Sequence, residues 1–335
     1  MTGKTIRGLS PPLLDALDQL TSEPSDGAWW RDVLRRRELM VAVRRDTLNV
    51  YYRGASIFQV TFNDGVITPL THAKYLSRRQ QGLVPLQSGR FAIDAESALW
   101  SSYGPETLSE MMAAAANLAG PEKIGLHALL IASPHVIDVE ISLEGVEETD
   151  EQQDGATLAA EEAAGDLTPP GSTTKGRQDR LDVATLERDG DRLRIVFHEA
   201  KHFSNAELRA SPDRDPKVAG QIGRYRRTLA HHADDLARSY QEVCRALVRI
   251  DAMRHRIDPH APALDQLIQD VAGSALPPLI DPEPRLVIFG FDRDQREGKV
   301  WTQHHLRLTN APPSGFGLKV TALGSTAARR APAFT

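Results

Sequence analysis

Residues 180–201 read RLDVATLERDGDRLRIVFHEAK, and this stretch decides the fold of the second half of the chain. Its centre, Asp189-Gly190-Asp191, has the composition of a tight hairpin turn. Apolar residues recur at every second or third position on both sides of the turn, at Leu181, Val183 and Leu186 before it and at Leu193, Ile195 and Phe197 after it. This near-alternation predicts a pair of antiparallel strands joined by the turn.

The register of this hairpin brings acidic side chains together. If the turn is centred between Gly190 and Asp191, Asp182 lies opposite Glu199, with about 5 Å between their Cβ atoms. Lys201 then shares their face of the sheet. Two carboxylates in such a position repel each other unless a cation lies between them, which favours a divalent-ion site.

A less specific interpretation is that these acids are solvated at the strand ends. A Glu-x-Lys pair on an exposed strand contributes less than about 1 kcal/mol and needs no ligand. The segment 194–197, however, is apolar in three of its four positions, which is typical of a buried strand. We therefore expect Glu199 to emerge at the edge of a core, and the site is the favoured interpretation.

Asp182, followed by Glu199-Ala200-Lys201 on the next strand, resembles the motif of the PD-(D/E)XK nuclease superfamily, with Leu181 in place of the proline. The resemblance covers roughly residues 110–308, the acidic segment described below excepted. It implies a restriction-endonuclease-like α/β core, in which helices flank a central mixed sheet. It also implies that Asp182, Glu199 and the Ala200 carbonyl hold one or two Mg²⁺ or Mn²⁺ ions. Lys201 would orient or deprotonate the attacking water, or neutralise charge in the transition state.

A third element follows at the spacing of the RecB-like and lambda-exonuclease-like branch of this superfamily. Gln221 and Tyr225 resemble its Q-x-x-x-Y motif, and their spacing places both on one face of a predicted helix. The resemblance implies that they orient a phosphate or a catalytic side chain. The basic residues predicted to bind nucleic acid are Arg180, Lys217 and Arg224. The alternative for Tyr225 is a core aromatic residue.

Upstream, Gly120-Pro121-Glu122 opens a predicted helix that runs to about Ile131, with proline at its first position. Glu122 continues an apolar stripe of leucines and should face inward. The resemblance implies that Glu122 joins the metal ligands. An equally good interpretation is a glutamate in the first turn, stabilised by the helix dipole.

The predicted strand 135–141 precedes the hairpin, and its Asp138 and Glu140 alternate with apolar residues, so they are expected on its solvent face. Gly176 and Asp179 also resemble the G-x-x-D form of the acidic motif. Pairing places Asp179 beyond the end of the hairpin arm, so Asp182 is the preferred ligand and Asp179 the second choice. A bulge would reverse that order.

The length of 335 residues suggests two domains. Residues 1–90, with a helical opening and a run of short strands, are predicted to form a β-rich domain that binds nucleic acid, a partner protein or a second copy of the chain. Residues 91–310 are the predicted nuclease-like domain, in which 286–291 and 300–308 are expected to be strands. Residues 311–335, rich in Pro, Gly, Ala and Ser, are expected to form a flexible tail.

An acidic segment explains the net charge of −5. Between residues 146 and 175 the chain is polar and carries eight acids, and it is expected to be a disordered insertion in the nuclease-like domain. Removing those eight charges leaves +3 for the rest of the chain, which suits a protein that binds nucleic acid. One cysteine excludes an intramolecular disulfide. No apolar segment reaches the length of a membrane span or a secretory signal, so we expect a cytoplasmic protein without membrane contact.

The sequence thus predicts a Mg²⁺- or Mn²⁺-dependent nuclease, with DNA favoured over RNA as the substrate and repair, restriction or anti-phage defence as its setting. Two alternatives stay open. One is a subunit that retains the fold and binds nucleic acid or assembles without cleaving it. The other is an RNase.

Overall fold

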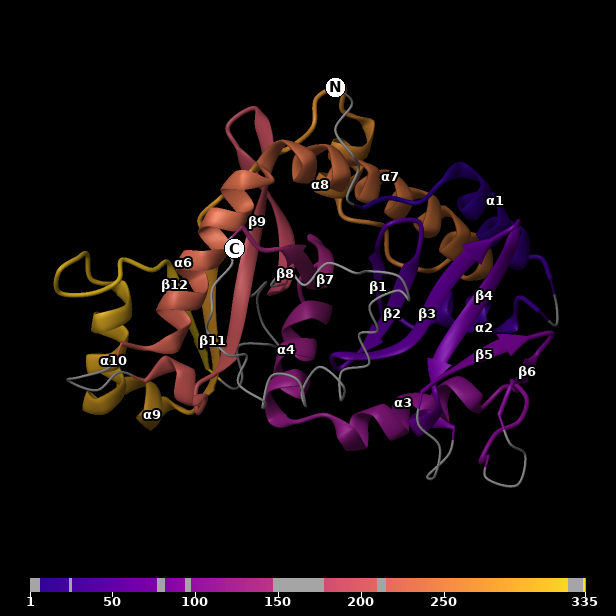
Figure 1. The fold of residues 1–335 in the computed structure, drawn as a ribbon, viewed down its shortest axis with the longest axis horizontal. Coiled ribbons are helices and arrows are strands. Elements are labelled where there is room, and N and C mark those ends of the chain that lie inside the picture. The colour runs from indigo at the N-terminus through magenta and orange to yellow at the C-terminus, as the bar shows by residue number, and fades with distance from the viewer. Residues whose placement is uncertain are drawn as a thin grey trace. The chain divides into compact units, whose positions relative to one another are not determined.

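The computed structural model describes residues 7–23, 26–76, 82–93, 98–146, 178–209, 215–324 and 334. Contacts divide these residues into two compact units. Residues up to Ala119 and from Arg238 to Pro277 form the N-terminal unit. The hairpin unit comprises the described residues of 120–146 and 178–237, together with those from Pro278 onwards. Both units combine a sheet with helices, which confirms the α/β class (Figure 1).

The N-terminal unit contains an antiparallel sheet with the strands in sequence order. Its elements before the sheet are α1 (Pro11–Leu20) and α2 (Ala28–Arg35). The sheet comprises β1 (Met40–Val43), β2 (Leu48–Tyr52), β3 (Ala55–Asn63), β4 (Val66–His72), β5 (Leu83–Gln87) and β6 (Arg90–Phe91), with the short helix η1 (Ala73–Tyr75) between β4 and β5. The expected β-rich region is therefore present.

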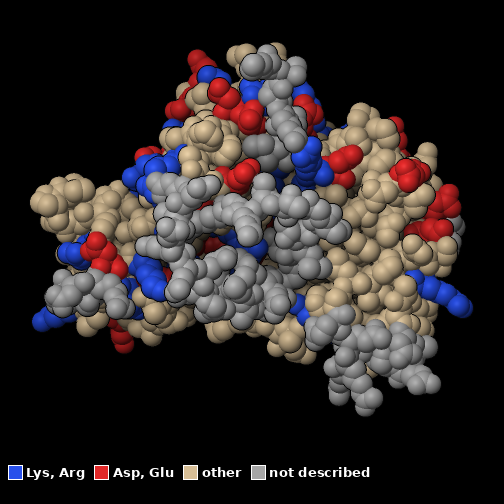
Figure 2. All heavy atoms as spheres, in the orientation of Figure 1, with Lys and Arg blue, Asp and Glu red and all other residues tan. Residues whose placement is uncertain are grey.

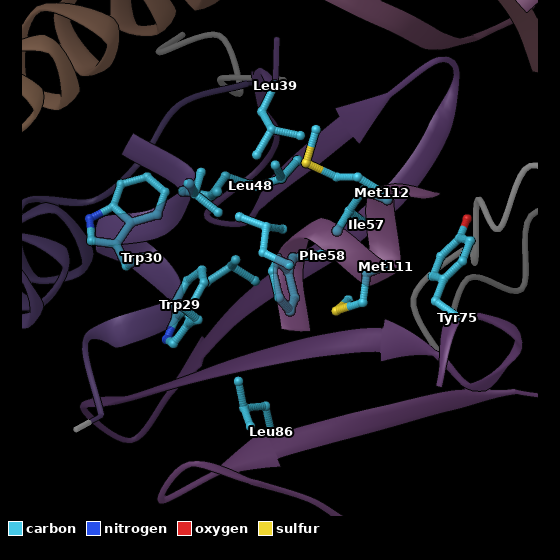
Figure 3. Close-up of a cluster of buried hydrophobic side chains, with 14 of the residues drawn as sticks. Trp29, Trp30, Leu39, Leu48, Ile57, Phe58, Tyr75, Leu86, Met111 and Met112 are labelled. Atoms are coloured by element: carbon cyan, nitrogen blue, oxygen red, sulfur yellow. The ribbon is translucent and has the colours of Figure 1, made fainter. Parts of the chain in front are cut away.

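The core of this unit forms because α2 places aromatic residues on the face that meets the sheet (Figure 3). The ring centroids of Trp29 and Trp30 lie 5.6 Å apart, and Trp29 lies 5.4 Å from Phe58 of β3. Burial of such large side chains is a dominant stabilising contribution. Met111 and Met112 of α3 (Thr107–Leu118) complete the same core.

Two later helices belong to the N-terminal unit as well. From Arg238 onwards, α7 (Ala233–Ile257) lies in this unit, and its Ile250 and Met253 join the core. The side chain of Gln241 donates to the carbonyl of Ser274, 2.7 Å away, just after α8 (Gln266–Gly273). The expected boundary at residue 90 is thus wrong for these helices, because their apolar faces pack into a core formed by distant parts of the chain.

The sheet of the hairpin unit is mixed. Its order is β12-β11-β9-β8-β7, and β10 pairs with β9 beside this path. β7, β8 and β9 are antiparallel, whereas β10 and β11 are parallel to β9 and β12 is parallel to β11. The strands are β7 (Val136–Glu144), β8 (Gln178–Asp189), β9 (Arg192–His202), β10 (Leu279–Ile280), β11 (Arg285–Phe291) and β12 (Val320–Gly324).

The register predicted for the hairpin is confirmed. Its ladder runs from Asp189 opposite Arg192 to Val183 opposite His198, as a turn centred between Gly190 and Asp191 requires. Gly190 has a φ of 59°, a conformation that the two-residue turn demands and that glycine adopts without strain.

Helices cover both faces of this sheet. α6 (Lys217–His231) packs its Val218 and Ile222 against Leu286 and Ile288 of β11. On the opposite face, Gly125 of α4 (Pro121–Ile131) lies against the ring of Phe289 so closely that a β-carbon would be only 2.5 Å away from it. The remaining helices are η2 (Ala206–Leu208), α9 (Arg293–Glu297) and α10 (Lys299–Thr309).

Two further expectations are wrong. Residues 299–309 form helix α10 rather than a strand, because Trp301 and Leu308 both face the core that includes Phe291. Within the tail, residues 320–324 form β12 and extend the sheet beside β11. The acidic segment after residue 146 lies outside the described residues. No helix in the described ranges is long and apolar enough to cross a membrane.

Candidate active site

Asp182 lies where the regular hairpin ladder ends. One residue beyond the Val183–His198 pair, its Oδ2 atom accepts a hydrogen bond of 2.8 Å from the backbone N–H of Ala200. The side chain thus bridges the two arms of the hairpin. This contact places the Asp182 carboxylate beside the Glu199-Ala200-Lys201 segment, as the sequence predicted.

Glu199 is the most deeply buried acid of the group, with 3% of its surface exposed. Its Oε1 atom lies 2.9 Å from the ammonium of Lys201, while Oε2 has no hydrogen-bond partner among the described residues. Burial, followed by the nearby charge of Asp182, raises the pKa of Glu199 to about 8. A buried carboxylate oxygen without a partner costs free energy, so this atom needs a proton or a cation.

Lys201 joins two acids from different elements. Its Nζ atom lies 2.9 Å from Glu199 and 2.8 Å from Oε2 of Glu207 in η2. Burial by itself lowers the pKa of Lys201, but Glu199, Asp182 and Glu207 outweigh burial and raise it above its ordinary value. These three acids therefore favour the ammonium form of Lys201 in this arrangement.

A second acid–lysine pair, from β7 and α4, lies next to Asp182. Glu140 sits between the pairs Val139–Val183 and Ile141–Leu181, so it is the residue opposite Asp182 on the neighbouring strand. Lys123 of α4 lies 2.7 Å from Oε1 of Glu140 and 3.8 Å from Oδ1 of Asp182. Glu140, then Asp182, overcome the effect of burial and raise the pKa of Lys123.

The expectation of a solvent face for Asp138 and Glu140 is wrong. Asp138 is 2% exposed, and its Oδ1 atom accepts from the backbone N–H of Val139. Glu140 has a φ of 50°, in the left-handed region that β-strand residues other than glycine rarely adopt. A register shift between Val136 and Asp138 also breaks the simple alternation that the prediction assumed.

Glu122 reaches the end of β9 from the first turn of α4. Its Oε2 atom accepts from the backbone N–H of His202 and from the side-chain amide of Asn205, both at 3.0 Å. The inward orientation predicted for Glu122 is thus present. In this arrangement Glu122 anchors the chain that follows Lys201, and whether it also binds a metal ion stays a prediction.

Asp179 occupies a separate position on β8, opposite Leu143 of β7. It is 4% exposed, its Oδ2 atom accepts a hydrogen bond of 2.6 Å from the hydroxyl of Thr228, and Oδ1 lies 4.0 Å from Nε of Arg224. Because these contacts come from α6, Asp179 ties that helix to β8. Asp182, not Asp179, contacts the Glu-x-Lys segment.

Gln221 and Tyr225 lie on the face of α6 that turns towards the sheet. The Gln221 amide donates to the hydroxyl of Tyr225 over 2.5 Å, and Tyr225 is 3% exposed. Burial, followed by the charge of Glu199 and with smaller contributions from Asp182 and Asp179, raises the pKa of Tyr225 well above its ordinary value. The phenol therefore remains protonated, and it lies close enough to these acids for their charge to affect its pKa.

The predicted nucleic-acid contacts are spread over two elements. Lys217 is exposed at the start of α6, Arg224 faces Asp179, and Arg180 lies on β8 opposite Ser142. On the face shown in Figure 2, the visible basic side chains are interspersed with acidic ones. On this face, surface charge does not mark out a nucleic-acid interface.

In the described part of the chain, no group of three or more His, Cys, Asp or Glu side chains is arranged to hold a metal ion. The acids lie beside ammonium groups instead: Glu199 beside Lys201, and Glu140 and Asp182 beside Lys123. Carboxylate oxygens are the ligands that Mg²⁺ and Mn²⁺ prefer. Glu199 Oε2 is buried without a partner among the described residues, and the Asp182 carboxylate is near enough to raise the pKa of Glu199, so these two acids supply ligands of the type that such an ion takes.

Sequence reasoning missed Lys123, Glu140 and Glu207 as members of this group. Glu207 follows the Glu-x-Lys strand by only a few residues, and Lys123 is adjacent to Glu122, so proximity to the motif was the available signal. Nothing in the local pattern distinguishes Glu140 from a solvent-facing acid.

No protein-family model, curated protein or solved structure matches the chain.

Proposed function

We propose that the hairpin unit is a metal-dependent phosphodiesterase that cleaves nucleic acid, with a restriction-endonuclease-like core. The observation that carries this proposal is the buried Glu199 carboxylate, which has one oxygen on Lys201 and one without a partner, close to Asp182. Such an arrangement is costly for folding alone, and perturbed buried acids of this kind are concentrated at functional sites. The mixed sheet with helices on both faces supports the choice of fold.

Asp182 and Glu199, with the carbonyl of Ala200, would hold the ion. A bound Mg²⁺ or Mn²⁺ supplies a Lewis acid that lowers the pKa of water and stabilises negative charge on a phosphate. Lys201 places an ammonium beside the same carboxylate and would neutralise charge on a non-bridging phosphate oxygen. Because the neighbouring acids favour the ammonium form of Lys201, we assign it the electrostatic role.

In the proposed reaction on DNA, a water oxygen forms a bond to phosphorus and the bond from phosphorus to the deoxyribose 3′ oxygen breaks. The proton lost by the water passes to solvent or to a site carboxylate, and the departing 3′ oxygen takes up a proton from solvent, so the products are a 5′-phosphate and a 3′-hydroxyl. Gln221 and Tyr225 do not perform chemistry in this scheme. Their mutual hydrogen bond holds a hydroxyl and an amide on one helical face, where they position the acids.

One observation favours a second candidate, a subunit that keeps the fold without cleaving. Each of the acids Glu140, Asp182 and Glu199 already has an ammonium group within 4.0 Å, so the site is partly neutralised without a divalent ion. A protein that used the fold for binding alone would show the same pairs. The unpartnered oxygen of Glu199 favours the enzyme, because an internal ion network has no need for it.

The experiment that separates these candidates is incubation of the purified full chain with labelled single- and double-stranded DNA and RNA, in Mg²⁺, Mn²⁺ or EDTA. The enzyme predicts cleavage of DNA that needs the ion and stops in EDTA. Cleavage of RNA alone would reassign the substrate. Binding without cleavage under every condition would favour the non-cleaving subunit, and full activity in EDTA would contradict the metal site.

A further inference from the structure

We propose that Lys123 is an internal counter-cation of the site, held in place by Glu140, which competes with a divalent ion for the carboxylate of Asp182. This inference rests on the proposed function only in its choice of ion. It assigns a role to two residues, Lys123 and Glu140, that lie outside the sequence motif.

The first observation is the position of the ammonium. Lys123 Nζ lies 2.7 Å from a Glu140 oxygen and 3.8 Å from Oδ1 of Asp182. The other Asp182 oxygen is engaged by the Ala200 N–H, so Oδ1 is the atom that a cation would approach. An ammonium at that distance repels a divalent ion strongly, because the interior screens charges far less than water does.

The second observation is that the surroundings fix the base of Lys123. The neighbouring residue Glu122 accepts from the His202 N–H and the Asn205 amide, which pins the first turn of α4 to the end of β9. The Lys123 stem therefore starts from a fixed point. A third of its side chain, 33%, is exposed, so the side chain borders solvent.

The third observation concerns the backbone of Glu140. Its φ of 50° in the middle of β7 is an unfavourable conformation for a residue with a side chain. Such outliers persist only where neighbouring contacts compensate, and they are concentrated at functional sites. Here the strained residue lies opposite Asp182 and its carboxylate holds Lys123. The strained backbone of Glu140 therefore favours a functional role for the Lys123–Glu140 pair over that of an ordinary surface ion pair.

The test is the affinity of the full chain for Mn²⁺ in the absence of nucleic acid, measured by calorimetry. Lys123→Met and Lys123→Gln are expected to raise this affinity by at least about tenfold, because each removes the competing charge. Lys123→Arg keeps the charge, so its affinity for Mn²⁺ should be close to that of the unmodified protein. The matched control is Lys319→Met, which removes a lysine 3.6 Å from the buried Asp281 in the same unit but away from the site.

Unchanged or weaker Mn²⁺ binding in Lys123→Met and Lys123→Gln overturns the proposal, and so does the absence of Mn²⁺ binding in every variant. If both variants unfold and Mn²⁺ does not restore their melting temperature, the lysine has a structural role and the proposal also fails. The result is independent of cleavage. If the protein cleaves no nucleic acid but the Lys123 variants bind Mn²⁺ more tightly, this inference stands and the proposed function fails. If the protein cleaves nucleic acid but the Lys123 variants bind Mn²⁺ no more tightly, the proposed function stands and this inference fails.

Discussion

The Asp182 carboxylate accepts a hydrogen bond from the backbone N–H of Ala200, across the hairpin and just past the last regular strand pair. The contact selects Asp182 over Asp179 as the acid that shares a site with Glu199. It also fixes Asp182 by a backbone group, whose position is insensitive to side-chain rotamers. The choice between the two aspartates can therefore be tested with substitutions that keep the hydrogen bonds.

Asp182→Asn should abolish Mn²⁺ binding and cleavage, because the amide oxygen can still accept from Ala200 while the negative charge is lost. Asp179→Asn should keep both, because the Thr228 hydroxyl can still donate to an amide oxygen. Calorimetry with Mn²⁺ and a cleavage assay on both variants provide the measurement. The opposite pattern would show that Asp179 is the ligand.

Glu199→Ala and Lys201→Ala should each lower the rate of nucleic-acid cleavage by at least about 100-fold, because one removes a metal ligand and the other a charge that stabilises the transition state. Glu283→Ala provides the control, since it removes an exposed partner of Arg226 in the same unit. Single-turnover rates with Mg²⁺ are the readout. Full activity of either site variant would contradict the proposed site.

The stability of the metal-free protein should fall as pH rises, because of Glu199. Its pKa is raised from 4.5 to about 8, so between these values the folded protein binds a proton that the unfolded chain releases. The contribution of this proton is complete below pH 4.5 and is lost as pH rises through about 8. Across this window, the free energy of unfolding of the unmodified chain in EDTA should fall by on the order of a few kcal/mol relative to that of Glu199→Gln.

Urea unfolding at several pH values, on both proteins, measures this difference. Adding Mn²⁺ should reduce the loss in the unmodified chain, because a bound cation stabilises the ionised carboxylate. If the free energy of unfolding changes with pH in the same way for the two proteins in EDTA, Glu199 is ionised in the folded state throughout the range.

Gln221→Ala and Tyr225→Phe should each lower cleavage by about 5- to 150-fold, because each removes one side of a hydrogen bond that positions the site. Tyr225→Ala should also lower the melting temperature, since it leaves a cavity beneath α6. Gln241→Ala, which breaks a buried glutamine contact in the N-terminal unit, should lower stability without affecting the rate. Unchanged rates in Gln221→Ala and Tyr225→Phe would remove this pair from the site.

Gly125→Ala should lower both stability and cleavage. Its β-carbon would lie 2.5 Å from the buried ring of Phe289, so either this ring or α4, which carries Glu122 and Lys123, must shift. Gly220→Ala in α6 is the matched control, because its nearest atom is 3.9 Å away at the end of Arg224. That change should be neutral or stabilise the helix by up to about 1 kcal/mol. Equal effects of the two changes would contradict the packing of α4.

The sequence by itself determined the hairpin and its register. A tight turn joins its strands directly, and with one face buried a slip of one residue would turn the apolar side chains outward. The meeting of Asp182 with the Glu199-Ala200-Lys201 segment follows from this local pattern. The helix from Pro121 to Ile131 was also predictable, since its first residue and its apolar spacing are local signals.

Only the tertiary structure decided the place of Glu140. Its position depends on the register shift at the start of β7 and on a backbone conformation that neighbouring strands impose. Lys123 joins the site because α4 packs on β9 and β11, a contact between distant segments. Residues 299–309 were expected to form a strand and form helix α10 instead. Short apolar patterns suit a helix or a strand equally well, and the choice is made by the surface against which they pack.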